Sequence, residues 1–218
     1  MNDYESHGLT KYPIFNIFLY YFCIFLLYLS YEYKKNIEMN IYNIFVCIFL
    51  SLYMIDFVGA CIHYYLDKYS GNNKYIKPIA IEFQKHHDEP FQIINCSNFS
   101  LIHQISTLYF LPFLSFVFHL YLKYINVTSN IIQSIIIIEI VIFSLGSLSQ
   151  ITHKLAHKMN YLSKKEQNTI FYSFIYFLQK YNIILTSKNH KIHHIKFDKN
   201  YSVFNGWSTT LFNKIIKQ

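Results

Sequence analysis

The stretch IIQSIIIIEIVIFSLGSLSQITHKLAH, residues 131–157, decides the fold class. It begins with an apolar run, residues 131–148, which is close to the roughly 20 residues that a helix needs to cross a bilayer. It ends with His153 and His157, which lie four residues apart and therefore share one face of a helix. Two imidazoles on one face can reach a single metal ion, so the stretch predicts a membrane helix that leads into metal ligands.

The composition of the whole chain indicates the same class. Of its 218 residues, 53% are hydrophobic, 20% are aromatic and only 14% are charged, against roughly 25% charged in a typical soluble domain. A core of this size cannot bury so much apolar material, so we expect a membrane protein. The 19 basic residues are all lysine and flank apolar runs, so the net charge of +7 indicates a membrane surface rather than nucleic acid as the partner.

Four apolar runs are long enough to be membrane spans: residues 13–29, 41–62, 108–122 and 131–148. The third is short and contains Pro112, so we expect it to be kinked or re-entrant. A further apolar stretch, residues 170–185, is broken by Gln179, Lys180 and Asn182. We interpret it as a helix lying in the membrane interface, with a fifth span as the alternative.

With four spans, the N-terminus, the loop of residues 67–106 and the tail from His153 onward face the same side of the membrane. These segments hold 16 of the 19 lysines, and the positive-inside rule therefore places them in the cytosol. We expect residues 1–40 to form an N-terminal tail with the first span, and residues 41–218 to form one histidine-rich membrane domain. The four cysteines form no CxxC pair and indicate structural thiols in a reducing compartment.

Eight of the eleven histidines fall into groups at the predicted cytosolic face. They are His63, His86, His87, His153, His157, His190, His193 and His194. Imidazole suits iron, copper, zinc and nickel, and eight rings exceed the three or four ligands of one zinc site. They fit two metals of five or six coordination, and the adjacent pair His86 and His87 can serve two neighbouring sites.

Carboxylates near these histidines can orient the imidazoles by hydrogen bonds without binding the metal; the candidates are Asp67, Asp88, Glu89 and Asp198. Asp67 is the first choice because it follows His63 by four residues. His7, His103 and His119 lie outside the groups, and we interpret them as ordinary surface or core residues. The sequence thus predicts an all-α, multi-pass membrane protein with about four transmembrane helices, a histidine-rich metal cap at the cytosolic face and one interfacial helix.

These groups lie in stretches that resemble the Kua-type desaturases, which include animal plasmanylethanolamine desaturase, its bacterial CarF-type relatives and a plastid phosphatidylglycerol desaturase. The matching stretches are DFV at 56–58, FQKHHDEP at 83–90, QITHK at 150–154, LQ at 178–179, IIL at 183–185, HKIHH at 190–194, NYSV at 200–203 and NGW at 205–207. The chain departs from the family's pattern at Tyr64, where the family prefers Trp, and loses a proline after His194. At Cys96 the family carries a further histidine, for which His103 is a possible substitute.

The resemblance implies that residues 41–218 form a lipid desaturase domain. The reaction would remove two hydrogens from an alkyl chain of a membrane phospholipid, with O2 as co-substrate and two electrons from cytochrome b5 and its reductase. In the plasmanylethanolamine branch the product is the vinyl ether of plasmalogens. The eight histidines would hold two iron ions, with Asp67 orienting them, in the endoplasmic reticulum membrane.

Two alternatives stay open at this point. The same di-iron site supports desaturation or hydroxylation of phospholipid acyl chains, which the histidine pattern cannot separate. A membrane metal-binding or transport protein would carry ionisable residues at mid-membrane, and Glu139 is the clear instance, with Asp56 nearer the end of its span. Because the histidines gather at one face instead of along a path, we favour the enzyme.

Overall fold

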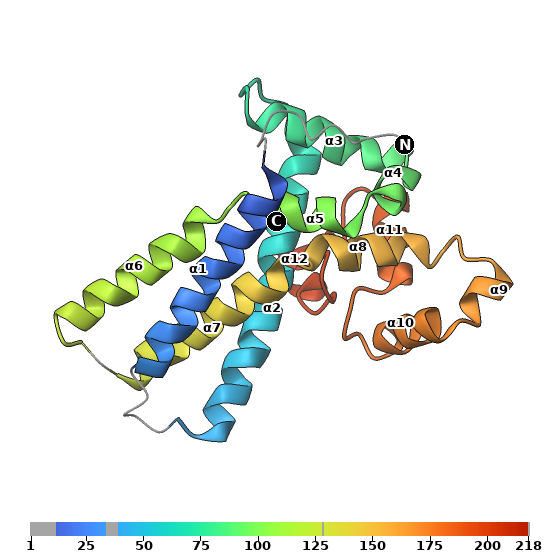
Figure 1. The fold of residues 1–218 in the computed structure, drawn as a ribbon. Helices are drawn as coiled ribbons and strands as arrows, with labels where there is room; N and C mark the ends of the chain where they lie inside the picture. The colour runs from blue at the N-terminus through green and yellow to red at the C-terminus, as the bar shows by residue number, and fades with distance from the viewer. Residues whose placement is uncertain (1–11, 34–38, 128, 218) are drawn as a thin grey trace. The chain divides into compact units, whose positions relative to one another are not determined.

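The structure is a computed structural model that describes residues 12–33, 39–127 and 129–217 (Figure 1). Every regular element within these ranges is a helix, and they contain no strand. The prediction of an all-α chain is therefore confirmed. His7 and the lysines Lys11, Lys34 and Lys35 lie outside the described residues.

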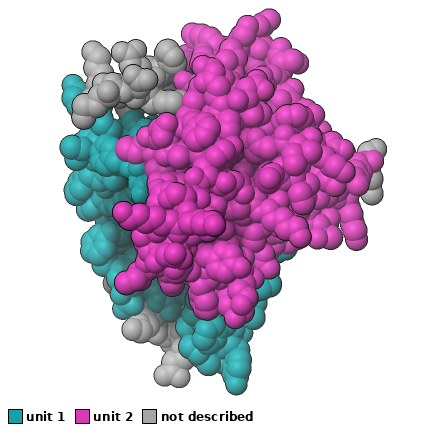
Figure 2. All heavy atoms as spheres, turned by 90° about the vertical axis from the view of Figure 1, so that its right-hand side faces the viewer, with its two compact units in different colours: residues 1–54, 98–148 teal, residues 55–97, 149–218 magenta. Residues whose placement is uncertain are grey.

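The chain divides into two compact units, which Figure 2 colours separately. Unit 1 contains Met1–Met54 and Asn98–Leu148, and unit 2 contains Ile55–Ser97 and Ser149–Gln218. The expected division into residues 1–40 and 41–218 stays a prediction.

Unit 1 is a set of packed apolar helices. They are α1 (Pro13–Tyr33), the first part of α2 (Ile41–Lys68), α5 (Asn98–Ser106), α6 (Phe110–Tyr124) and α7 (Asn130–Gly146). Helix α1 packs against α5, α6 and α7 (Figure 1), and the Tyr20 hydroxyl donates a hydrogen bond of 2.7 Å to the Phe143 carbonyl. Helix α7 begins at Asn130 because the Ser129 side chain accepts a hydrogen bond from the backbone N–H of Ile132.

The surface of unit 1 is more apolar than parts of its interior. Phe15 and Phe18 of α1 are exposed, whereas Asn16 of the same helix and Gln133 of α7 are buried. Helices that face lipid keep their few polar groups on the side that faces other helices. Unit 1 therefore has the pattern of a membrane-embedded bundle.

Among the described residues, two helices are long and apolar enough to cross a membrane, Pro13–Glu32 and Ile41–Lys68. Two pairs of helices separated by short breaks, α5 with α6 and α7 with α8, raise the number to four if each pair is one span. Helices α5 and α6 meet at 45°, and Pro112 lies in the first turn of α6, where proline is tolerated. The prediction of a multi-pass membrane protein is thus confirmed.

Unit 2 is built from shorter helices. They are the second part of α2, α3 (Ile76–Asp88), α4 (Phe91–Asn95), α8 (Ser149–Lys158), α9 (Lys164–Gln167), α10 (Ile170–Lys180), α11 (Ser187–Ile195) and α12 (Thr209–Ile215). Helix α8 packs against α4 and α11. Ala60, Tyr201 and Phe212 form a buried apolar cluster in which α2, α12 and the segment before α12 meet. Tyr64, which replaces the family's Trp, packs its ring edge-on against Tyr201.

Helix α10 covers only part of the apolar stretch at residues 170–185. Its 11 residues extend about 16 Å, roughly half the hydrocarbon thickness of a bilayer. It is not one of the candidate spans found in the described part of the chain. Ile175 and Gln179 are buried, whereas Phe171 and Phe174 are exposed, which is the two-sided pattern that an interfacial helix requires. Its placement in the interface stays a prediction.

Candidate metal centre

Helix α2 supplies His63, a predicted metal ligand, and Asp67, the carboxylate predicted to orient the imidazoles. Both residues belong to unit 2. One helical turn separates them, and His63 Nε2 lies 3.3 Å from Asp67 Oδ2. The other ring nitrogen, Nδ1, donates a hydrogen bond of 2.9 Å to the Tyr201 carbonyl. The segment before α12 therefore fixes which edge of the His63 ring faces Asp67.

Helix α3 supplies His86 and His87. The Gln84 side-chain amide donates to the carbonyls of Leu66 at 2.9 Å and Tyr69 at 3.0 Å, which ties α3 to the end of α2. Because successive helical residues point about 100° apart, two adjacent histidines on α3 face different neighbours. His86 Nδ1 donates to the Phe83 carbonyl of its own helix.

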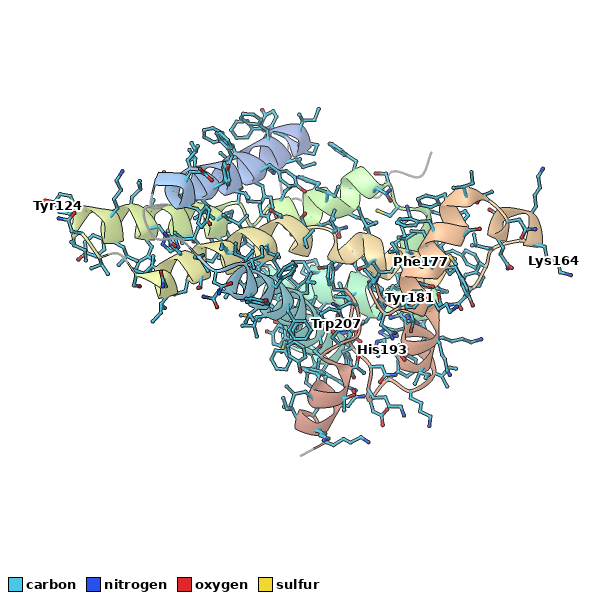
Figure 3. All side chains as sticks on the ribbon, turned by 90° about the horizontal axis from the view of Figure 1, so that it is seen from below. Tyr124, Lys164, Phe177, Tyr181, His193 and Trp207 are labelled. Atoms are coloured by element: carbon cyan, nitrogen blue, oxygen red, sulfur yellow. The ribbon has the colours of Figure 1, made fainter. Side chains whose placement is uncertain are left out.

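Helices α8 and α11 supply the other five histidines. His153 and His157 lie on one face of α8, and both are buried. Helix α11 begins at Ser187 because the Thr186 side chain accepts a hydrogen bond from the Asn189 N–H. This start places His190, His193 and His194 on the final turns of α11, where Figure 3 labels His193.

The eight histidines and Asp67 converge as two groups. Within each group, the candidate ligand atoms all lie within 4.8 Å of one another. The five-histidine group consists of His86, His153, His157, His190 and His194. The carboxylate group consists of His63, Asp67, His87 and His193. Both adjacent pairs, His86 with His87 and His193 with His194, are divided between the groups, so α3 and α11 each contribute to both.

In the five-histidine group the rings face one another nitrogen to nitrogen. His190 Nε2 lies 2.7 Å from His157 Nε2, 2.9 Å from His153 Nε2 and 3.0 Å from His194 Nε2. A single proton on His190 cannot satisfy three facing lone pairs, whereas a cation between them can. Ligands at right angles around an ion with metal–nitrogen bonds of about 2.1 Å would be about 3.0 Å apart, so these separations fit a shared metal.

In the carboxylate group, three rings surround one oxygen. Asp67 Oδ2 lies 3.0 Å from His87 Nε2, 3.3 Å from His63 Nε2 and 3.3 Å from His193 Nε2. The sequence predicted that Asp67 orients the imidazoles without binding the metal. The structure instead places its oxygen among the candidate ligand atoms, so Asp67 can also serve as a ligand.

Backbone carbonyls select the tautomers of three of these rings. The Nδ1 atoms of His63, His86 and His193 donate to the carbonyls of Tyr201, Phe83 and Lys199. In a neutral imidazole this leaves Nε2 with its lone pair. Within the described ranges, these three Nε2 atoms are buried and make no hydrogen bond, although those of His63 and His193 lie 3.3 Å from Asp67 Oδ2. Metal-ligating histidines commonly show this pattern, with one nitrogen on a carbonyl and the other on the ion.

The surroundings of His86, His190 and His194 favour the neutral imidazole. Burial, followed by the charges of neighbouring rings such as His153 and His157, lowers the pKa of His190 well below its ordinary value. Burial and the neighbouring His157 lower the pKa of His194 to about 2. Burial likewise lowers the pKa of His86. Because a histidine must be deprotonated to bind a metal, these three rings are in the metal-binding form at neutral pH.

A cavity of about 270 Å³ adjoins the carboxylate group. It is lined by Asp67, Lys68, Gln84, His87, Asp88 and Phe197. Asp88, one of the carboxylates considered from the sequence, therefore lies beside the centre. Glu89 instead pairs with Lys85 at 3.6 Å, and Asp198 is exposed.

Two of the histidines left out of the sequence groups, His103 and His119, have other partners in unit 1. His119 Nε2 lies 2.6 Å from Glu139 Oε2, which also accepts a hydrogen bond from Ser115. His103 Nε2 lies 3.3 Å from the Asn16 side-chain nitrogen. The two metal-binding groups, as found among the described residues, include neither His103 nor Cys96.

Two residues that organise the centre were not predicted as site residues. Gln84 was noted only as part of a matching stretch, yet it attaches α3 to α2. Asp56 was considered as an ionisable residue in a span, yet its carboxylate accepts five hydrogen bonds from residues 204–208. The signal for both was their position in stretches that match the family, FQKHHDEP for Gln84 and DFV for Asp56.

The comparisons with known proteins agree with this centre. A family model described as lipid desaturase domain matches residues 48–216, which include all nine side chains of the two groups. None of the curated proteins and none of the solved structures that were compared matches the chain. The family match confirms the resemblance drawn from the histidine stretches. The chain belongs to the lipid desaturase domain family and is a membrane lipid desaturase with a histidine cluster.

Proposed function

We propose that this desaturase is a plasmanylethanolamine desaturase that holds two iron ions. In this reaction an alkyl-ether phospholipid, O2, two electrons and two protons give a vinyl ether and two molecules of water. The two hydrogens leave the two carbons next to the ether oxygen. The observation that carries the proposal is the convergence of eight imidazoles and one carboxylate as two adjoining groups.

The residues fit two irons of five or six coordination. The five-histidine group would hold one ion, and the carboxylate group would hold the other. Imidazole with carboxylate suits iron, and the unpartnered Nε2 atoms of His63, His86 and His193 are the expected donors. Bound iron would supply the activation of O2 needed to break an unactivated C–H bond, which side chains alone do not provide.

The protein's own groups would keep this centre ordered. The carbonyls of Tyr201 and Lys199 hold the protons of His63 and His193 at Nδ1, which keeps Nε2 available. Burial of His153, His190 and His193 excludes water from the ring edges that face one another. The apolar helices of the chain would hold the alkyl chain of the lipid, since the substrate is itself a membrane component.

The ether-lipid substrate rests on the resemblance to the Kua-type family, and one experiment tests it directly. The protein is expressed in cells that lack their own plasmanylethanolamine desaturase, and the cells are fed an alkylglycerol. We expect acid-labile vinyl-ether phospholipids to reappear, and the matched His190→Ala variant to restore none. A new double bond in an acyl chain would move the enzyme to the acyl-lipid branch, and an alcohol would make it a hydroxylase.

We further propose that the centre and both termini face the cytosol, in the endoplasmic reticulum, where cytochrome b5 and its reductase supply the electrons. Support comes from the 16 of 19 lysines that four spans would place on one side. Protease treatment of intact microsomes should degrade tags at both ends, whereas protection of one tag would contradict this orientation. Purified enzyme in liposomes should depend on added cytochrome b5, and equal turnover without it would remove this partner.

A further inference from the structure

Asp56 is a buried carboxylate that the proposed chemistry does not use. It is 0% exposed and lies on α2, two helical turns before His63. Its Oδ1 accepts the backbone N–H groups of Phe204, Asn205 and Gly206 at 3.2, 3.0 and 3.0 Å. Its Oδ2 accepts the N–H and the hydroxyl of Ser208 at 2.9 and 2.7 Å. One side chain thus holds the whole turn of residues 204–208.

That turn ends the segment that orients two members of the carboxylate group. The Lys199 carbonyl accepts from His193 Nδ1, and the Tyr201 carbonyl accepts from His63 Nδ1, each at 2.9 Å. Gly206 adopts φ of +84°, a conformation that suits glycine, so the turn has a defined shape. The Thr152 hydroxyl adds a second hold by donating to the Val203 carbonyl at 2.7 Å.

The five-histidine group is attached differently. His86 Nδ1 donates to the Phe83 carbonyl of α3, and His153 Nδ1 lies 3.4 Å from the Gln150 side-chain oxygen of α8. These partners belong to the same helices as the histidines themselves. A change in residues 199–208 should therefore reach the carboxylate group first.

We propose that Asp56 is a positioning residue for the carboxylate group. By holding the turn at 204–208, it places the two carbonyls that fix the tautomers and ring directions of His63 and His193. The inference rests on the proposed two-metal function and deepens it, because it assigns the tautomers of His63 and His193 to a hydrogen-bond network centred on a residue outside both groups.

The test counts metal ions in the full-length protein in detergent. Wild-type protein and Asp56→Asn, each freed of metal, are loaded with excess Co(II), desalted and analysed for cobalt and visible absorption. We expect two Co(II) per chain in the wild type and about one in Asp56→Asn. Adding His63→Ala to Asp56→Asn should change nothing further, whereas adding His190→Ala should remove the remaining ion.

The matched control is Tyr20→Phe, which removes a partly buried hydrogen bond in unit 1 and should leave two Co(II) per chain. Asp56→Asn protein that keeps both ions with the wild-type spectrum would overturn the proposal. So would folded protein that loses both ions in equal proportion, because Asp56 would then support the whole unit and not one site.

Two milder variants keep the proposal testable if Asp56→Asn does not fold. Ser208→Ala removes one of the five hydrogen bonds to Asp56. Gly59→Ala adds a Cβ only 2.7 Å from Val203 Cγ2, which pushes on the same segment by contact. Each should weaken Co(II) binding at one site by at least tenfold while the other stays unchanged. Equal weakening of both sites, or of neither, would overturn the positioning role.

The same experiment separates this inference from the proposed function. A wild-type protein that binds a single Co(II) would contradict the two-iron centre. The role of Asp56 would then be supported if Asp56→Asn and His63→Ala each abolish that binding, and overturned if only His63→Ala does.

Discussion

Buried histidines occur in both units of the molecule, and their surroundings differ. In unit 1, His119 is 1% exposed and faces the Glu139 carboxylate at 2.6 Å. In unit 2, His153 is equally buried, but its Nε2 faces the same nitrogen of His190 at 2.9 Å and of His157 at 3.2 Å. His119 therefore faces a group of opposite charge preference, whereas His153 faces other imidazoles.

This difference teaches more than burial or residue type alone. The Glu139 carboxylate pairs with His119 Nε2, so the pair explains an ionisable residue in a membrane helix without any transport function. Imidazoles whose lone pairs converge are not satisfied by one another, because each neutral ring carries only one proton. Within the described residues, the candidate metal-binding groups therefore lie in unit 2.

The largest effect is expected from removing a ring of the cluster. His190→Ala should lower desaturase activity by at least about 100-fold, because His190 meets three other rings of its group. Alanine at any of the other seven clustered histidines should act in the same direction. His119→Ala should remain active, and membranes with equal amounts of each variant allow the comparison. A fully active His157→Ala, or an inactive His119→Ala of normal abundance, would contradict the division.

Metal content gives the second comparison. Elemental analysis of purified protein should find two irons per chain, since five and four donors form two groups. A strong chelator should remove both the iron and the activity, and Fe(II) should restore both. The His119→Ala protein should hold as much iron as the wild type. One zinc per chain with no iron would refute the di-iron centre.

The third comparison changes a carboxylate to an amide in each unit. Asp67→Asn should lower activity by about 10- to 100-fold, because an amide is a poorer partner for His63, His87 and His193. Glu139→Gln should leave turnover nearly unchanged and lower the free energy of unfolding by about 1–2 kcal/mol, through a weaker bond to His119. Turnover and thermal unfolding should be measured on both proteins. Equal losses of activity would contradict the claim that Asp67 serves activity and Glu139 serves stability.

Many residues of the centre could be predicted from the sequence, because their spacing along the chain matches the turn of a helix. His153 and His157, like His63 and Asp67, lie one turn apart, so a helical period alone places them on one face. The apolar runs likewise predicted α1 and α2 from their first residues, Pro13 and Ile41, although both helices extend beyond the predicted ends. These features depend on neighbours in the chain, which a single sequence contains.

The rest depends on contacts between residues that are distant in the chain. Asp56 meets residues 204–208 about 150 positions away, and no local pattern predicts that a carboxylate in an apolar helix will hold a turn. The division of His86 and His87 between two groups depends on where α3 lies, which the Gln84 contacts with α2 decide. The end of α10 at Lys180 was not predicted either, because the Gln179 side chain bonds to the Leu185 carbonyl beyond the helix.

The smallest effect on activity and iron content is expected from substituting Cys96. Such variants test whether the cluster of unit 2 is complete without the family's further histidine. Cys96 is buried, and its carbonyl accepts a hydrogen bond of 2.6 Å from Lys154 Nζ, an interaction that any residue at this position can make. Cys96→Ala should therefore retain two irons and near-normal activity, and lower the free energy of unfolding by no more than about 1 kcal/mol. Cys96→His should likewise leave the metal count at two, since both groups assemble without a ligand from this position. Iron analysis and turnover of the two variants beside the wild type test this, and a severalfold gain in activity or iron retention with Cys96→His would mean that the centre of this chain lacks a ligand.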